Sequence, residues 1–236
     1  MKKILILLPF LFLLFSCKRE SIIEEIEEKE AEEAKVSFGI DISEYQGDID
    51  WEKFASQKKH PIEFVIIRSS MGDDRKDAKF QSNFREAKAR GFMVGAYHYY
   101  DPNEKSELQA KNFLETVRLE KGDFIPIVDI ENISKVQTMA QLKIGLQKWL
   151  DIVEKHYGVR PMIYTGFSFY LTYLADEFSE YPLWIAAYTP SKRGHGVVLD
   201  SEIHQFTEKV RVSGIKGNKV DGNDIKKNDL PKLLLK

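Results

Sequence analysis

The sequence predicts a single domain of the α/β class, in which parallel strands close into a barrel. From residue 37 onward, short apolar runs alternate with segments of helical periodicity. Several of the apolar runs contain almost no polar residue, as expected for strands that are covered on both faces. A repeated order of strand then helix implies parallel strands that are joined by right-handed crossovers.

Eight segments are predicted as strands, because each is a short apolar run bounded by turn residues or by a helical pattern. In chain order they are Phe38–Ile42, Phe64–Ser69, Met93–Tyr99, Ile125–Ile130, Pro161–Thr165, Leu183–Ala187, Ile203–Phe206 and a short strand near Val220.

Five helices are predicted between the first six strands. The longest carries one apolar stripe that includes Leu146, Trp149 and Val153, and Gly158 follows as a typical C-terminal stop. After residue 187 the helical patterns end and glycines mark the connections, so the sequence predicts a TIM-like (β/α)5(β)3 barrel. The five helices are Trp51–Lys58, Phe80–Arg90, Glu104–Leu119, Thr138–Tyr157 and Phe169–Leu174.

Composition excludes several classes of function. The chain has 236 residues, with 35 Lys and Arg against 37 Asp and Glu, so no strong basic field suggests nucleic acid as a partner. The sequence contains no Gly-rich phosphate loop and no Gly-x-Ser-x-Gly elbow. Metal-ligand spacing is also absent, so neither a cofactor nor a metal is implied.

The N-terminus has the proportions of a signal peptide. Two lysines precede an apolar run of about 12 residues, Ile4 to Phe15, which is too short to span a bilayer comfortably. The run ends in Leu14-Phe15-Ser16-Cys17, which resembles the lipobox of bacterial lipoproteins. That resemblance implies a lipoprotein signal peptide over residues 1–16 and a lipid on Cys17. The alternative is an ordinary signal peptide with an incidental cysteine.

Residues 17–36 are predicted to be the lipidated cysteine and an acidic tether, with the barrel spanning residues 37–236. Residues 18–35 hold eight Glu against four Lys or Arg and too few large apolar groups to form a core. A partner-binding helix is the alternative. Because Cys17 is the one cysteine of the chain, an intramolecular disulfide and a Cys-based zinc site are both excluded.

Asp129 and Glu131 are the strongest candidates for chemistry. They follow the apolar run Ile125 to Val128, and side chains two positions apart on a strand share a face, with Cα atoms about 6.5–7 Å apart. Two crowded acids repel, so one should keep its proton to higher pH. A protonated acid beside a carboxylate can cleave a glycosidic bond. The alternative is a helix cap or a solvated rim.

Other polar and aromatic residues also follow the predicted strands, and in such a barrel the active site gathers at the C-terminal strand ends. Aromatic rings can stack on sugar rings, while amides and carboxylates can bind hydroxyls. Any one of the aromatic residues alone more often serves barrel packing, and the alternative for Asp41 and Asp221 is a turn acid at a strand end. His98 can be either a sugar contact or a core histidine. The candidates for binding or support are Asp41, Asp221, Tyr97, Tyr99, Tyr164, Trp184, Tyr188 and Gln205.

These motifs together resemble the family 25 glycoside hydrolases, the Chalaropsis-type lysozymes. The resemblance runs in consistent order from Phe38 to Ile225, and it departs from the family pattern at Met71, His204 and Gly222-Asn223-Asp224. The matching segments include Gly39-Ile-Asp41-Ile-Ser43, Gln46-Gly47, Ile49-Asp50-Trp51, Phe64-Val-Ile-Ile-Arg68, Gly95-Ala-Tyr97-His98-Tyr99, Pro126-Ile-Val-Asp129-Ile-Glu131, Arg160-Pro-Met-Ile-Tyr164-Thr165, Pro182-Leu-Trp184-Ile-Ala186 and Val220-Asp221.

The resemblance implies an N-acetylmuramidase that cuts the β-1,4 bond between N-acetylmuramic acid and N-acetylglucosamine in peptidoglycan. It implies Glu131 as general acid and Asp129 as support for the 2-acetamido group or the developing positive charge, with a retained product. Neighbouring-group participation and a carboxylate nucleophile both remain open. Two rivals are a non-catalytic glycan-binding lipoprotein and a glycosidase of chitin-like polymers. We expect a monomer, exported and anchored at the periplasmic side or the cell surface.

Overall fold

The structure is a computed structural model that describes residues 36–57, 61–188, 201–217 and 220–236. The predicted signal peptide, Cys17 and the tether up to residue 35 lie outside these residues. No helix within the described ranges is long and apolar enough to cross a membrane.

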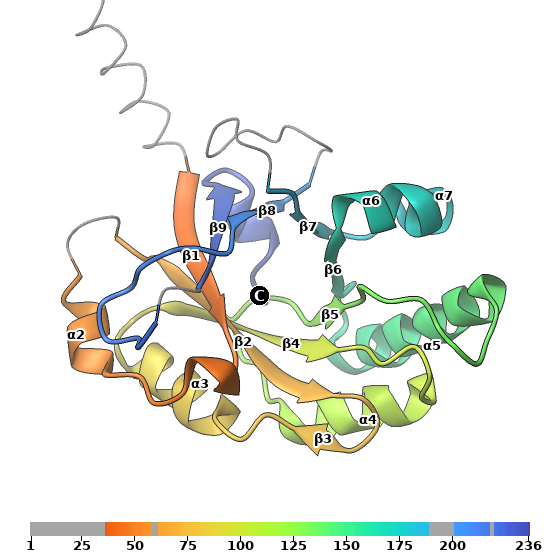
Figure 1. Cartoon of the computed structure of the whole chain (residues 1–236), viewed down its shortest axis with the longest axis horizontal. Coiled ribbons are helices and arrows are strands. Elements are labelled where there is room, and N and C mark those ends of the chain that lie inside the picture. Colours follow the sequence, from red (N-terminus) through yellow and green to blue (C-terminus); the bar gives the residue numbers. More distant parts are fainter. Residues whose placement is uncertain (1–35, 58–60, 189–200, 218–219) are drawn as a thin grey trace, which may run out of the picture. The chain divides into compact units, whose positions relative to one another are not determined.

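Eight strands of the described chain form a closed barrel (Figure 1), as the sequence predicts. Their order is β1-β9-β8-β7-β6-β5-β4-β2, and a parallel pairing of β1 with β2 closes the ring. The strands are β1 (Val36–Ile42), β2 (Phe64–Met71), β4 (Met93–Tyr99), β5 (Ile127–Asp129), β6 (Met162–Gly166), β7 (Leu183–Ala186), β8 (Ile203–Thr207) and β9 (Asp221–Lys226).

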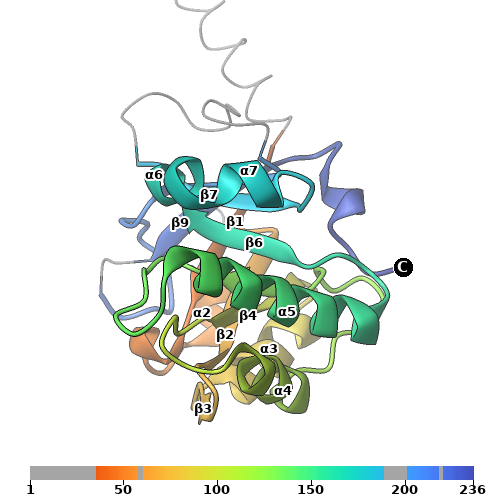
Figure 2. The same cartoon turned by 90° about the vertical axis from the view of Figure 1, so that its right-hand side faces the viewer.

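Helices follow each of the first five barrel strands, as predicted. Within the residues that the structure describes, no α-helix follows the last three strands. Helices α4 and α5 lie side by side on the outside of the strands (Figure 2). The helices are α2 (Trp51–Ala55), α3 (Phe80–Ala89), α4 (Ser106–Thr116), α5 (Met139–Tyr157) and the pair α6 (Phe167–Phe169) and α7 (Ala175–Phe178), which flank a π-helical turn, η2 (Tyr170–Leu174).

Several details differ from the sequence prediction. Strand β9 runs antiparallel to β8, whereas parallel strands were predicted. The predicted helix Phe169–Leu174 is the middle of a longer helical segment over residues 167–178. A two-residue strand, β3 (Arg75–Lys76), pairs antiparallel with the end of β2. Short 3-10 turns form at η1 (Glu44–Gln46) and η3 (Leu230–Lys232). Elements this short have too few residues to show a periodic pattern in the sequence.

The near-continuous apolar strands are explained by two separate core layers. On β2, Val65 and Ile67 pack with the surrounding helices, while Phe64 and Ile66 belong to the cluster that fills the barrel. Both sets are buried, because alternate side chains of a strand point to opposite faces. The barrel interior is therefore a packed core, and the space available to a ligand lies where the strands end.

Candidate active site

The strand register places four of the predicted site residues side by side. Tyr99 pairs with Asp129, Asp129 pairs with Tyr164, and Tyr164 pairs with Trp184 across β4 to β7. On the far side of the barrel, Gln205 of β8 pairs with an asparagine of β9. Because the barrel is closed, β1 and β9 bring their own acids to the same end.

A cavity of about 220 Å³ lies at this end of the barrel. Its lining includes every predicted catalytic or supporting residue except Tyr188, which reaches it through a hydroxyl group that donates to Gln205 Oε1 at 2.6 Å. The full lining is Asp41, Ile42, Ser43, Tyr45, Gln46, Arg68, Tyr97, Tyr99, Asp129, Glu131, Tyr164, Trp184, Gln205 and Asp221.

Asp129 and Glu131 form a hydrogen-bonded carboxyl pair. Asp129 is 5% exposed at the end of β5, whereas Glu131 is exposed to solvent. Burial raises the pKa of Asp129 well above its ordinary value, and the charge of Glu131 raises it further. Burial also raises the pKa of Glu131, although its hydrogen bond with Asp129 acts in the opposite direction. The pair therefore keeps a proton to a higher pH than an isolated acid would, with Asp129 as donor and Glu131 as acceptor.

Asp41 and Asp221 form a second carboxyl pair in the same cavity. Burial raises the pKa of Asp41 to about 6, against hydrogen bonds from two neighbouring amides that lower it. Burial and the charge of Asp41 raise the pKa of Asp221 to about 7. This second pair also shares a hydrogen bond, so the cleft contains two carboxyl pairs that can each share a proton.

Asp41 is held by two side-chain amides. Gln205 Nε2 donates to Asp41 Oδ2 at 2.9 Å, and Asn223 Nδ2 donates to the same oxygen at 2.7 Å. The other end of Gln205 accepts from the hydroxyl of Tyr164 at 2.9 Å. These bonds fix the orientation of the Gln205 amide, so Asp41 sits in a rigid hydrogen-bonded frame.

The predicted aromatic residues divide into buried and open groups. Trp184 is 1% exposed, donates from Nε1 to Asn223 Oδ1 at 2.8 Å and meets the Tyr164 ring edge-on at 4.5 Å. Its role is therefore chiefly to support the floor of the cleft. Tyr188 is 52% exposed and Tyr99 is partly exposed, so their rings can reach a ligand.

His98 lies outside the cleft and is a core histidine. It is fully buried, stacks on Trp149 at 5.7 Å and bonds through Nδ1 to Ser70 Oγ at 2.8 Å. Burial lowers its pKa to about 4. Of the two readings that the sequence left open, the structure supports the packing role.

Arg68, Tyr45 and Asn223 belong to the site although they were not among the predicted site residues. Arg68 is 6% exposed, lines the cavity and donates from Nε to Asp77 Oδ2 at 3.1 Å. A charged residue directly after the apolar run Phe64 to Ile67, within the same strand, is the one sequence signal that could have pointed to it. Asn223 is recognisable only once β9 is placed beside β1.

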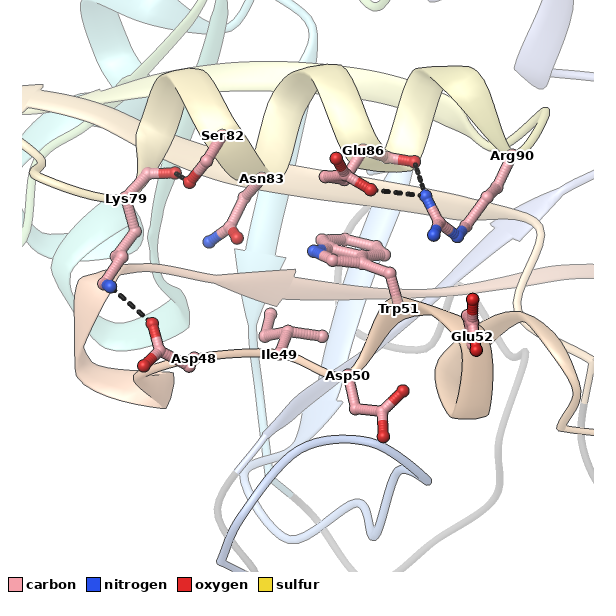
Figure 3. Close-up of a pocket in the computed structure, with 10 residues that line it drawn as sticks. All are labelled: Asp48, Ile49, Asp50, Trp51, Glu52, Lys79, Ser82, Asn83, Glu86 and Arg90. Atoms are coloured by element: carbon pink, nitrogen blue, oxygen red, sulfur yellow. Dashed lines mark hydrogen bonds and ion pairs between the residues drawn. The ribbon is translucent and has the colours of Figure 1, made fainter.

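A second pocket of about 360 Å³ lies between α3 and the segment from Asp48 to Glu52 (Figure 3). It contains none of the cleft acids. The Ile49-Asp50-Trp51 motif falls here and has structural roles: Asp50 Oδ1 accepts from the Lys53 backbone at 3.1 Å and caps α2, while Trp51 packs on Phe54 with ring centroids 4.8 Å apart.

Comparison with known proteins agrees with this geometry. The family profile of "Glycosyl hydrolases family 25" matches residues 40–215. An uncharacterized protein of Escherichia coli K12, YegX, is 35% identical over 181 residues, which are 76% of this chain and 66% of the relative. The chain thus spans slightly less than two thirds of that relative.

Two further matches are informative. The autolytic lysozyme of Clostridium acetobutylicum is 29% identical over 183 residues, which are 76% of this chain and 53% of that protein. Among solved structures, a family 25 glycosyl hydrolase from Bacillus anthracis superposes with a TM-score of 0.70 at 27% identity, covering 80% of this chain and 88% of that one.

Proposed function

This chain belongs to glycosyl hydrolase family 25, and from that membership we propose that it is a lysozyme. Its substrate would be the β-1,4 bond between N-acetylmuramic acid and N-acetylglucosamine in peptidoglycan. One structural observation carries the proposal: the proton-sharing pair of Asp129 and Glu131 lines a cavity at the C-terminal ends of the strands. Names of relatives such as the autolytic lysozyme of C. acetobutylicum support the same reaction.

We assign Glu131 as the general acid because it is the exposed member of the pair. The proton that the pair holds passes through Glu131 to the glycosidic oxygen as the bond to the sugar breaks. Asp129 is left ionised beside the positive charge that develops at the reacting sugar. Both carboxyl groups are then ionised, and Glu131 recovers a proton from the water that completes the hydrolysis.

Asp129 is also suited to orient the 2-acetamido group. Its Oδ1 is buried and has no hydrogen-bond partner among the residues that the structure describes. An acetamido N–H donor would satisfy this oxygen, and an unsatisfied buried acceptor is costly. The acetamido oxygen would then attack the anomeric carbon, and water would open the resulting ring to give the retained product. Asp41 and Asp221 would contribute to the electrostatic field from the other wall of the cleft.

The test is clearance of isolated cell walls, followed by identification of the new reducing sugar. The wild-type protein should clear the walls and release N-acetylmuramic acid reducing ends. Glu131→Gln should fold normally and lose about 10²–10⁴-fold in rate, since a general acid typically contributes that much. Cleavage of chitin oligomers without clearance of walls would favour the chitin-like substrate. New N-acetylglucosamine ends from walls would mean that the other β-1,4 bond of the strand is cut.

A non-catalytic glycan-binding protein is the other alternative. It predicts that wild-type and Glu131→Gln protein bind walls equally and that neither releases sugar. Residual activity of Glu131→Gln above about a tenth of the wild-type rate would show that another group supplies the proton.

We further propose that the protein is a monomer and is exported as a lipoprotein anchored at the periplasmic side or the cell surface. The N-terminal pattern supports the export and the anchor. The motif Leu14-Phe15-Ser16-Cys17 and the short apolar run before it favour lipidation of Cys17. The acidic stretch that follows would separate the anchor from the barrel of residues 37–236.

A further inference from the structure

Tyr45 lies in an unusual position for a large aromatic residue. It is 76% exposed, yet it lines the cavity that contains Asp129 and Glu131. It belongs to the short turn η1 between β1 and α2. A single exposed aromatic residue needs no explanation by itself, so the way in which this one is held is what matters.

Hydrogen bonds fix the backbone of the turn on both sides of Tyr45. The Ser43 backbone N–H donates to Gln46 Oε1 at 2.7 Å, in a capping box that spans the turn. The Glu44 backbone N–H donates to Asp77 Oδ2 at 2.8 Å. The turn is thus tied to the segment that follows β2, and its shape does not depend on the exposed ring.

Arg68 lies against the ring of Tyr45. The guanidinium carbon is 4.6 Å from the ring centroid, a distance typical of a cation–π contact. Two acids hold the guanidinium in place, with Nε 3.1 Å from Asp77 Oδ2 and a terminal nitrogen 3.1 Å from Glu44 Oε1. The buried arginine supports the tyrosine from the protein side, while most of the residue stays open to solvent.

We propose that Tyr45 is a stacking platform for a sugar ring of the glycan strand, outside the two rings that flank the cleaved bond. This rests on the proposed lysozyme function. The carbon face of a pyranose ring is apolar and fits the open face of a preoriented aromatic ring. Arg68 is a positioning residue, because it fixes the ring and lies on its protein side.

The first test compares long glycan strands with a tetrasaccharide that extends little beyond the cleaved bond. For Tyr45→Ala, KM on long strands should rise roughly three- to tenfold, the effect of losing one aromatic contact, with kcat within about twofold. Tyr45→Trp should keep the wild-type KM, and the tetrasaccharide should not distinguish the variants. Ile144→Ala is the matched control, because Ile144 is 60% exposed on α5 and does not line the cavity.

Arg68→Lys tests the positioning role. Lysine keeps the charge but lacks the planar fork that contacts both acids and the ring. It should raise KM on long strands, and it should add little to KM in a chain that already carries Tyr45→Ala. An equal effect of Arg68→Lys on KM with and without Tyr45 would overturn the claim that arginine acts through the tyrosine.

A binding measurement separates this proposal from the proposed reaction. In the Glu131→Gln background, Tyr45→Ala should weaken cosedimentation with purified glycan strands by the same roughly three- to tenfold factor. The platform would be overturned if the wild-type protein cleaves walls and Tyr45→Ala binds and cleaves long strands as well as the wild type does. A fall in kcat at unchanged KM would also overturn it. A wild-type protein that binds strands through Tyr45 but cleaves nothing would contradict only the lysozyme reaction.

Discussion

Burial raises the pKa of all four carboxyl groups in the cleft, and the acids are arranged as two hydrogen-bonded pairs. Each pair therefore keeps a proton to a higher pH than isolated acids would. A cleft that holds these protons carries less negative charge than its four acids suggest. Such a site can accept a neutral or acidic sugar strand and still provide a proton donor.

The first prediction concerns the titration of the Asp129 and Glu131 pair. In Asp129→Asn the proton is no longer shared between two mutually repelling acids, and the alkaline limb reports Glu131 alone. Burial and the charge of Asp221 still raise the pKa of Glu131, but it should lose its proton at a lower pH than the wild-type pair does. The alkaline limb of the pH–rate profile should move toward acid, at a greatly reduced rate. The measurement is kcat/KM on cell walls across pH for both proteins. An alkaline limb at the same pH in both would show that the two acids do not titrate together.

At the residue scale, the sequence predicted acids that the structure places in one cleft, but not the groups that hold them. Asp129 and Glu131 stand two positions apart, so the strand period alone predicts that they share a face. The contact between Asn223 and Asp41 joins positions separated by 182 residues. No local pattern reports such a pairing, because it depends on barrel closure. Arg68 was missed for the same reason, since its partners come from two other segments.

At the scale of elements, long periodic or continuously apolar segments were predictable and short ones were not. Helix α5 begins at Met139, one residue after the predicted start at Thr138, and ends at Tyr157 as predicted. Strand β3 has two residues and no pattern of its own. Strand β9 runs antiparallel to β8, a direction that apolar periodicity cannot reveal.

The second prediction compares two glycines, Gly158 just before strand β6 and Gly166 at its end. Gly158 ends α5 with φ of 72°, a left-handed conformation that side chains disfavour, and no atom lies within 4 Å of an added Cβ. Gly158→Ala should therefore lower the free energy of unfolding by about 1–2 kcal/mol through backbone strain alone. Gly166 is the matched control, because its φ of −70° suits alanine and its Cβ would also meet nothing.

Denaturant unfolding of the two variants is the measurement. Gly166→Ala should change the free energy of unfolding by less than about 0.5 kcal/mol, since a smaller unfolded-state entropy offsets a slightly poorer cap. Equal losses in both variants would mean that the two sites respond to side-chain volume and that backbone conformation at Gly158 is not the cause.

At the scale of the whole molecule, closure of the barrel brings the residues of the site together. The sequence order puts Asp41 on the first strand and Asp221 on the last, and only the ring brings the two acids into one hydrogen bond. The barrel core is complete within the residues from β1 onward. We therefore expect that this part carries its own stability and does not need the N-terminal segment.

The last prediction tests whether the N-terminal segment provides only the membrane anchor, while the barrel folds and acts without it. If Cys17 carries the anchor, Cys17→Ala should move the protein from the detergent phase to the aqueous phase, and a chain of residues 36–236 should be soluble and as active as the full protein. A lipoprotein cysteine with two or three acyl chains gives stable anchoring, whereas a single chain binds membranes only marginally. Detergent partition of both variants, with mass spectrometry of the N-terminal peptide, measures this. Unmodified Cys17 in the exported protein would contradict the anchor, and an unfolded 36–236 chain would contradict an independent barrel. Because wall clearance is scored separately, neither result would be confused with loss of the acid pair's chemistry.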